Sequence, residues 1–260
     1  MKIDEILISK AITESFMKDF VEAMEVDIAI AGAGPAGMTT AYYAAKAKVK
    51  TVVFERQLRV GGGMPGGGMM FNRIVVQEEG KKLLDEFNVK TTEYEEGYYI
   101  ADSLEATSSI CSKAIKAGAR IFNLMGIEDV MIREDNRITG LVLNWGAVSL
   151  ARLHVDPLAI RSKVVIDATG HASEICHIVV NKIGAKLRTE TGGLMGEKPM
   201  LADIGEREIV ENTKEVYPGL IVAGMAANAV FGSPRMGPIF GGMLLSGKIA
   251  AETALDILTR

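Results

Sequence analysis

The chain has 260 residues, a formal net charge of −4 at pH 7 and 48% hydrophobic residues. This length suits one large domain or a domain with an inserted module, and we expect a single unit over residues 1–260. The excess of acidic residues argues against nucleic-acid binding, and no apolar run reaches transmembrane length. Two cysteines, Cys111 and Cys176, provide no disulfide framework. A cytoplasmic enzyme that binds neither nucleic acid nor membrane is the expected class.

A helix and a strand open the chain. Residues 1–24 predict an amphipathic helix, because apolar residues recur on one side of it, namely Ile6, Ile12, Phe16 and Phe20. Residues 26–31 are a short apolar run bounded by turn residues, which predicts a buried strand.

A glycine motif follows this strand. Gly32, Gly34 and Gly37 have G-x-G-x-x-G spacing and lead into a predicted helix over residues 35–48. The first glycine allows a tight turn, the second lets the backbone approach a pyrophosphate, and the third lets the helix pack closely on the sheet. Glu55 ends the next strand, about where a ribose-binding acid belongs. Together these features predict a dinucleotide or adenosine-diphosphate site.

A second glycine cluster covers residues 61–68. Regular structure is disfavoured there because each glycine has a large backbone entropy to lose. A mobile surface loop is one interpretation. We prefer a loop whose backbone lies against a ligand, because it leaves the end of a strand where ligands bind in open α/β sheets.

The remaining pattern predicts a Rossmann-like, glutathione-reductase-type α/β fold with an inserted antiparallel β-meander over residues 127–153. The meander would comprise strands at 127–132, 138–145 and 148–153. Residues 188–216 have no clear assignment, and residues 228–237 predict a loop. Sheet strands are expected at 51–54, 120–123, 163–167 and 219–223, and helices at 75–87, 102–117, 174–183 and 238–258.

Candidate chemistry centres on histidine, aspartate and arginine. His154 and Asp156 would share one face of a strand, and His171 follows a predicted sheet strand at its carboxyl end, where ligand loops gather. Imidazole and carboxylate suit Fe(II), Zn(II) or Mn(II), although a lone histidine is more often structural. Arg235, in a Gly/Pro-rich loop, either binds a carboxylate or phosphate or is an ordinary surface residue. Two residues, Cys176 and His177, are interpreted as packing residues of a helix.

Several motifs together closely resemble the Thi4 family, the thiamine thiazole synthases. They are GAGPAG, FER, GGGMPGGGM, LHVDP, DATGH and RMGPIFGGM, and they extend over nearly the whole chain. Archaeal members of this family have also been described as ribose 1,5-bisphosphate isomerases. The resemblance implies that NAD is consumed as a substrate: nicotinamide leaves, the sugar opens to a ketose, glycine condenses as an imine, and sulfur addition and cyclisation produce an ADP-linked thiazole carboxylate.

The resemblance also implies residue roles. Asp156 and His171 would be Fe(II) ligands contributed by neighbouring subunits of a homo-oligomer, expected to be an octamer, and they would act in catalysis with His154. Arg235 would hold the glycine carboxylate. The NAD contacts would include the three motif glycines together with Ala36, Glu55, Arg56, Gly63, Ile127, His154, Val155, Asp156 and Met225.

One position distinguishes branches of the family. Fungal and plant members have a sulfur-donating Cys where this chain has His154, and that enzyme turns over once. His154 has no sulfur to donate, so the chain resembles the archaeal branch, which uses free sulfide over multiple turnovers. Pro234 stands where Asn is common in the family.

Two alternatives stay open. The first is an FAD-dependent oxidoreductase of the glutathione-reductase type, although the last strand of many such proteins ends in Gly-Asp and here Gly224 is followed by Met225. The second is a nucleotide-sensing or storage protein without turnover.

Overall fold

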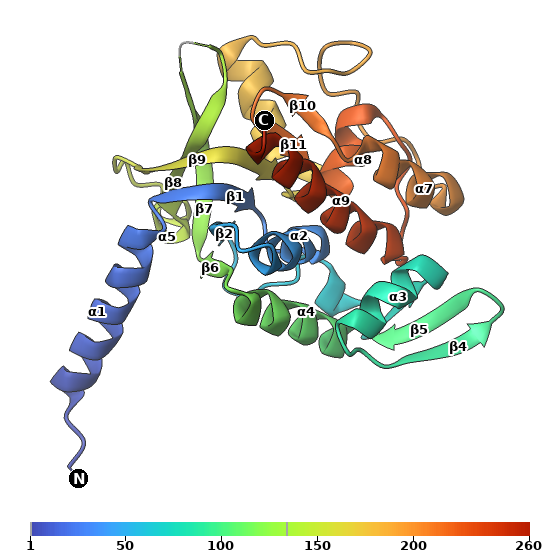
Figure 1. Ribbon diagram of the computed structural model, residues 1–260, viewed down its shortest axis with the longest axis horizontal. Coiled ribbons are helices and arrows are strands. Elements are labelled where there is room, and N and C mark those ends of the chain that lie inside the picture. The colour runs from blue at the N-terminus through green and yellow to red at the C-terminus, as the bar shows by residue number, and fades with distance from the viewer. Residues whose placement is uncertain (1, 134) are drawn as a thin grey trace.

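The central element of the fold is a mixed sheet that is eight-stranded in the part of the chain that the structure describes, residues 2–133 and 135–260. The structure is a computed structural model (Figure 1). The main path of the sheet runs β10-β11-β9-β1-β2-β6, and β7 and β8 extend it beside β9. In that order the path strands are β10 (Glu215–Tyr217), β11 (Leu220–Val222), β9 (Leu158–Asp167), β1 (Glu25–Ala31), β2 (Thr51–Glu55) and β6 (Arg120–Asn123).

The parallel centre of this sheet confirms the expected Rossmann-like class. β1 pairs in parallel with both β2 and β9, and β11 and β6 continue the parallel pairing on either side. Ile28, Ile30 and Val164 are fully buried, as expected for strands covered on both faces. The carboxyl ends of β1, β2 and β9 therefore meet at one edge of the sheet.

Three helices cover one face of the sheet: α2 (Pro35–Lys46), α4 (Ser103–Ala117) and α9 (Gly241–Leu258) (Figure 1). α2 and α9 pack very closely, since a Cβ atom placed on Gly247 would lie 2.4 Å from the carbonyl oxygen of Ala36. The expected helix over 238–258 begins later, at Gly241, because Phe240 and Pro238 form backbone hydrogen bonds with Val75 instead.

A second, three-stranded antiparallel sheet was not expected from the sequence. It has the order β3-β5-β4, formed by β3 (Arg73–Val76), β4 (Thr91–Glu95) and β5 (Tyr98–Asp102). The predicted helix over 75–87 is therefore wrong at its start: β3 ends at Val76, and α3 (Glu78–Glu86) follows. The backbone groups of Val75 and Val76 pair with β5, which overrides the local helical pattern.

The predicted meander is correct for two strands and wrong for the third. β7 (Met125–Ile132) and β8 (Ile138–Trp145) pair antiparallel. Residues 148–153 form no strand, because α5 (Gly146–Leu150) occupies the first half of this stretch. The second partner of β8 is β9, whose first half pairs with β8 and whose later part pairs with β1 and β11. Both edges of β8 are thus occupied without a third meander strand.

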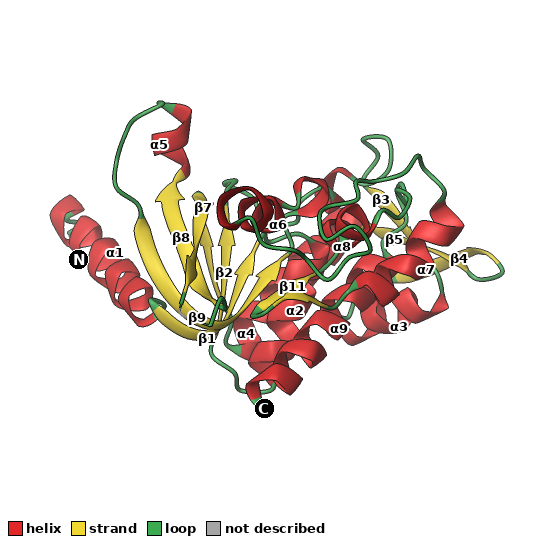
Figure 2. Ribbon diagram, turned by 90° about the horizontal axis from the view of Figure 1, so that it is seen from above, coloured by secondary structure: helices red, strands yellow, loops and turns green. Residues whose placement is uncertain are grey.

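Three further helices, α6, α7 and α8, follow β9 in the chain. The expected helix over 174–183 is α6 (Glu174–Ile178) followed by the π-helical turn η3 (Val179–Ile183). The unassigned stretch contains α7 (Ala202–Asn212), and the expected loop at 228–237 begins inside α8 (Met225–Phe231). Figure 2 shows the helices around the twisted sheet.

The N-terminal helix α1 (Glu5–Glu22) is confirmed, but most of its apolar side is exposed. Phe20 is buried and packs on Phe122, whereas Ile6 and Ile12 are each 66% exposed. The helix projects from the body of the protein (Figure 1). None of the described helices is long and apolar enough to cross a membrane.

Candidate functional site

A cavity of about 620 Å³ lies at the carboxyl ends of β1, β2 and β9. Ligands bind at this edge in open α/β sheets, where the strand order reverses. The cavity brings together many of the residues predicted from the sequence. Those lining it are Gly32, Gly34, Ala36, Glu55, Arg56, Gly63, Ile127, His171, Met225 and Arg235.

The first glycine turn has the geometry that its motif predicts. Gly32 has φ +100°, and a Cβ atom on it would lie 2.5 Å from the carbonyl oxygen of Ala168. A Cβ atom on Gly37 would lie 2.0 Å from the carbonyl oxygen of Gly32. Gly34 differs, because a Cβ atom there would meet nothing within 4 Å. Two of the glycines therefore serve packing, and Gly34 leaves space in the cavity.

Helix α2 begins directly at this turn. Gly34 is its N-cap and Pro35 its first residue, and no side chain caps its free backbone N–H groups. An uncapped helix N-terminus beside a cavity favours a bound anion, because the N–H groups and the helix dipole both attract negative charge. This arrangement is suited to a pyrophosphate.

Glu55 fastens the end of β2 to the glycine turn. Its carboxylate accepts hydrogen bonds from the N–H of Ala33 and from the N–H of Gln57, each at 2.8 Å, and the residue is 7% exposed. The predicted contact of Glu55 with a ribose stays a prediction. The structure adds a second role, which is to hold Ala33 in place within the turn.

The second glycine cluster lies beside the first turn and lines the cavity, and the expected contact of its backbone with a ligand stays a prediction. We call residues 60–72 the glycine loop. Gly61 donates a hydrogen bond to the carbonyl of Ala33 at 2.7 Å, which fixes the loop to the first turn. The loop contains a short 3-10 turn, η1 (Met64–Gly66), with Met64 fully buried. A Cβ atom on Gly63 would meet nothing within 4 Å, so this glycine also leaves cavity space open.

His171 lies in the short 3-10 turn η2 (Gly170–Ala172), just after β9. Its Nδ1 lies 2.5 Å from Oε1 of Glu197. Since an ionised carboxylate only accepts hydrogen bonds, the contact places an imidazole proton on Nδ1, and in the neutral ring Nε2 then carries the lone pair. Metal-binding histidines are commonly oriented by such a carboxylate.

Glu197 was missed by sequence analysis because it lies in the unassigned stretch. The adjacent backbone explains its position. Lys198 donates to the carbonyl of Ser233 at 3.1 Å, and Arg235 donates to the carbonyl of Lys198 at 3.3 Å. The Glu197 segment and the Arg235 segment therefore run side by side. Arg235 lines the cavity, and Glu197 contacts His171, which also lines it.

Arg56 and Glu174 form an ion pair in the lining of the cavity. Burial raises the pKa of the Glu174 carboxyl, while the neighbouring Arg56 guanidinium opposes the shift. Sequence analysis did not single out Glu174, because nothing in its local pattern distinguishes it from a residue that starts a helix.

His154, Val155 and Asp156 do not belong to the cavity of their own chain. They lie in an exposed irregular segment, so the predicted strand with both polar side chains on one face is wrong. This segment follows α5 and arches away from the sheet before β9 begins (Figure 2). Its backbone is not in a strand because β8 is already paired with β7 and β9.

The two predicted iron ligands are consequently not assembled within one chain: His171 lines the cavity and Asp156 does not. Within residues 2–133 and 135–260, no three His, Cys, Asp or Glu side chains come together as a possible metal site. A shared site between subunits stays a prediction.

The packing interpretation of the α6 residues is half right. Cys176 is fully buried, and burial raises the pKa of its thiol well above the ordinary value. His177 is exposed, because successive residues of a helix point about 100° apart and this turn takes it away from the buried side. Cys111 is half-buried in α4.

The strand order and the two glycine loops define a protein with a Rossmann-type α/β fold. The chain belongs to the Thi4 family, whose model matches residues 9–240. It is 59% identical to a thiamine thiazole synthase of Methanothermobacter thermautotrophicus, over 99% of this chain and 100% of that protein. It is 51% identical to a thiamine thiazole synthase of Pyrococcus abyssi, over 98% of each chain.

Solved structures agree with this assignment. The crystal structure of Thermovibrio ammonificans THI4 matches with a TM-score of 0.98 at 50% identity and covers 100% of both chains. A probable FAD-dependent monooxygenase, PqsL of Pseudomonas aeruginosa, matches with a TM-score of 0.54 at 14% identity, over 90% of this chain and 86% of that one. This second likeness shows the fold alone, in agreement with the expected glutathione-reductase-type sheet.

Proposed function

We propose that the protein catalyses thiamine thiazole synthesis. In this proposal NAD, glycine and free sulfide are converted, with Fe(II), into an ADP-linked thiazole carboxylate and nicotinamide, over multiple turnovers. The observation that carries the proposal is a single cavity that joins two glycine loops, an oriented His171 and Arg235. The names of the relatives at 51–59% identity support the same activity.

The dinucleotide part of the proposal rests on the shape of the cavity. Gly34 and Gly63 both line it, and a Cβ atom on either would project into open space. The N–H groups at the start of α2 would bind the pyrophosphate. Glu55, at the end of β2, would accept hydrogen bonds from a ribose. Ala36, Ile127 and Met225 would supply apolar contacts.

The donor set also fits iron. Glu197 contacts Nδ1 of His171, so Nε2 of the neutral ring would be the ligand atom, and imidazole with carboxylate is a ligand set that Fe(II) accepts. Asp156 of a neighbouring subunit would complete the protein ligands. Bound Fe(II) would supply open coordination positions and Lewis acidity. The protein itself would orient the imidazole through Glu197 and hold the glycine carboxylate at Arg235.

The sulfur source follows from position 154. His154 carries no sulfur, and Cys176 is fully buried. Free sulfide is therefore the donor in this proposal, and the chain survives each reaction intact. A homo-oligomer, expected to be an octamer, would bring the exposed segment around Asp156 to a neighbouring cavity. We place the protein in the cytoplasm.

FAD-dependent oxidation is the second candidate, and the end of β11 disfavours it. Gly224 has φ +65° and is the N-cap of α8, and Met225 follows it in the lining of the cavity. A flavoprotein of this fold commonly places an Asp there, toward the ribityl chain. A buried methionine offers no equivalent hydrogen bond.

Mass spectrometry distinguishes the candidates. We expect anaerobically purified protein, once denatured, to release NAD, an ADP-ribulose–glycine adduct or an ADP-thiazole. Release of FAD from yellow protein would refute the proposal. In an assay with NAD, glycine, sulfide and Fe(II), product should exceed the molar amount of subunits. Product that stops at one per subunit would contradict multiple turnover.

A further inference from the structure

The small antiparallel sheet is attached to both loops that face the cavity. The glycine loop leads directly into β3 at Arg73. The segment that follows Arg235 pairs with the same strand: Val75 donates to the carbonyl of Pro238 at 3.4 Å, and Phe240 donates to the carbonyl of Val75 at 3.0 Å. The position of β3 therefore sets where the glycine loop lies relative to the Arg235 segment.

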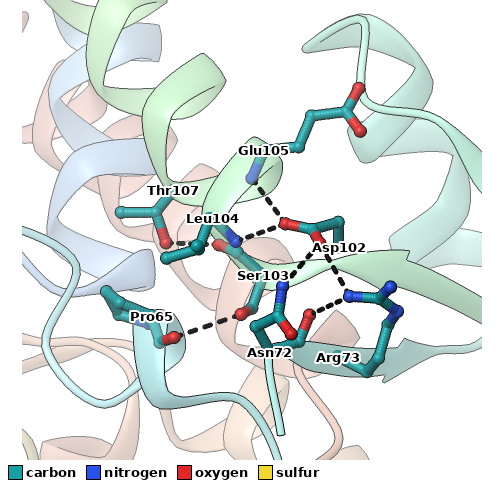
Figure 3. A network of polar contacts seen from close by, with 8 residues as sticks. All are labelled: Pro65, Asn72, Arg73, Asp102, Ser103, Leu104, Glu105 and Thr107. Atoms are coloured by element: carbon teal, nitrogen blue, oxygen red, sulfur yellow. Dashed lines mark hydrogen bonds and ion pairs between the residues drawn. The ribbon is translucent and has the colours of Figure 1, made fainter.

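Asp102, the last residue of β5, fixes the start of β3. It lies opposite Arg73 in the strand register. Its Oδ2 accepts hydrogen bonds from Nη1 of Arg73 at 2.7 Å and from Nδ2 of Asn72 at 2.8 Å. Its Oδ1 accepts from the N–H groups of Leu104 and Glu105, at 2.9 and 3.0 Å, and thereby caps α4 (Figure 3). One carboxylate thus ties α4 to the end of the glycine loop.

The first turn of α4 also holds the middle of the glycine loop. Ser103 is fully buried, and its hydroxyl donates to the carbonyl of Pro65 at 3.2 Å (Figure 3). Thr107 donates its hydroxyl to the carbonyl of Ser103 at 2.7 Å. A Cβ atom on Gly61 would lie 2.6 Å from Cγ2 of Thr107, so the loop has little room to shift toward the helix.

We propose that Asp102 is a positioning residue, which holds the glycine loop in its ligand-binding shape although it does not line the cavity. The physical reason is the entropy of a glycine-rich segment, which must otherwise be lost when the ligand binds. Asp102 fixes Asn72 and Arg73 to α4, so part of the loop's conformational entropy is already lost on folding and need not be lost when the ligand binds. The inference deepens the proposed function and rests on it.

The first test compares two serine substitutions at matched helix caps. Asp102→Ser retains a side-chain cap for α4 but is too short to reach Arg73 and Asn72. Asp4→Ser is the control, because Asp4 caps α1 in the same way, through the N–H groups of Ile6 and Leu7 at 2.9 and 3.1 Å. The helix α1 takes no part in the cavity.

The readout is the dissociation constant of ADP-ribose and of NAD, measured by calorimetry. We expect Asp102→Ser to weaken binding about fivefold to tenfold, as for loss of preorganisation in one loop. Asp4→Ser should change it by less than about twofold. In the thiazole assay, KM for NAD should rise more than kcat falls. A general loss of stability would not produce this split.

Arg73→Gln provides the second variant, because it removes the ion pair and leaves the α4 cap intact. It should weaken binding by a similar factor, and the double variant with Asp102→Ser should bind no more weakly than Asp102→Ser alone. If Asp102→Ser does not fold, Arg73→Gln decides the question. Wild-type binding in Arg73→Gln or in folded Asp102→Ser would overturn the inference. A wild-type protein that binds neither ADP-ribose nor NAD would instead overturn the proposed function.

Discussion

Nδ1 of His171 lies 2.5 Å from Oε1 of Glu197, although the two residues are 26 positions apart in the chain. The contact orients an imidazole that lines the cavity and places a proton on its Nδ1. This relationship links the end of a sheet strand, where a ligand residue was expected, to a segment that the sequence pattern left unassigned.

The first prediction concerns this pair. Glu197→Gln should weaken Fe(II) binding about tenfold to a hundredfold, because residues behind a metal-binding histidine typically contribute this much. Anaerobic Fe(II) titration measures the effect. The control is Glu190→Gln, an exposed position in the same segment. Equal affinity in both variants would show that Glu197 does not orient a ligand.

The second prediction concerns sharing of the metal site between subunits. Asp156→Ala and His171→Ala should each abolish iron binding and product, because two protein ligands leave no redundancy. Co-expression of the two variants should restore part of both, since some interfaces then pair an intact Asp156 with an intact His171. Full activity in either single variant would refute the ligand assignment. If co-expression restores no iron binding, the metal site is not shared between subunits.

The third prediction concerns the sulfur donor. His154→Cys should not lose sulfur from the protein during turnover unless other residues cooperate in its release. Intact-protein mass spectrometry before and after turnover provides the measurement. A mass loss of one sulfur would show that this single position determines the donor.

The fourth prediction separates the roles of two motif glycines. Gly34→Ala should leave stability nearly unchanged and weaken nucleotide binding at least about tenfold, because the new methyl group enters cavity space. Gly37→Ala should destabilise the fold by about 1–3 kcal/mol, because its Cβ atom would lie 2.0 Å from the backbone of Gly32. Urea unfolding and calorimetry measure the two effects, and the reverse pattern would refute both roles.

The fifth prediction concerns Glu206 and pH. Burial raises the pKa of its carboxyl, against the opposing effect of the Gly242 N–H, and its Oε2 is buried without a partner among the described residues. The folded state therefore binds the proton more tightly than the unfolded state. Stability from this group is present at low pH and is lost as pH rises from the unfolded pKa through the folded one.

Glu206→Gln should accordingly reduce the fall in stability between pH 5 and neutrality, because glutamine does not ionise. Urea unfolding over this range measures it, with Glu211→Gln, exposed on the same helix, as the control. If the free energy of unfolding of Glu206→Gln falls with pH as steeply as that of the wild type, Glu206 is not the cause of the fall.

Local patterns predicted much of the fold. The strand, glycine turn and helix over 26–48 are confirmed because the motif needs only neighbouring residues to form. The third meander strand was wrong because pairing depends on which sheet edges are free, and β9 takes the edge of β8. β3 was missed because its partner β5 is distant in sequence.

The sequence by itself determined the parallel sheet, the two glycine loops and the family, since each is encoded in contiguous motifs with fixed spacing. Only the tertiary structure decided that Glu197 orients His171, that Asp102 holds the glycine loop, and that His154 and Asp156 lie outside the cavity of their own chain. The physical reason is that these relationships join residues through long-range backbone pairing, and no local periodicity records them.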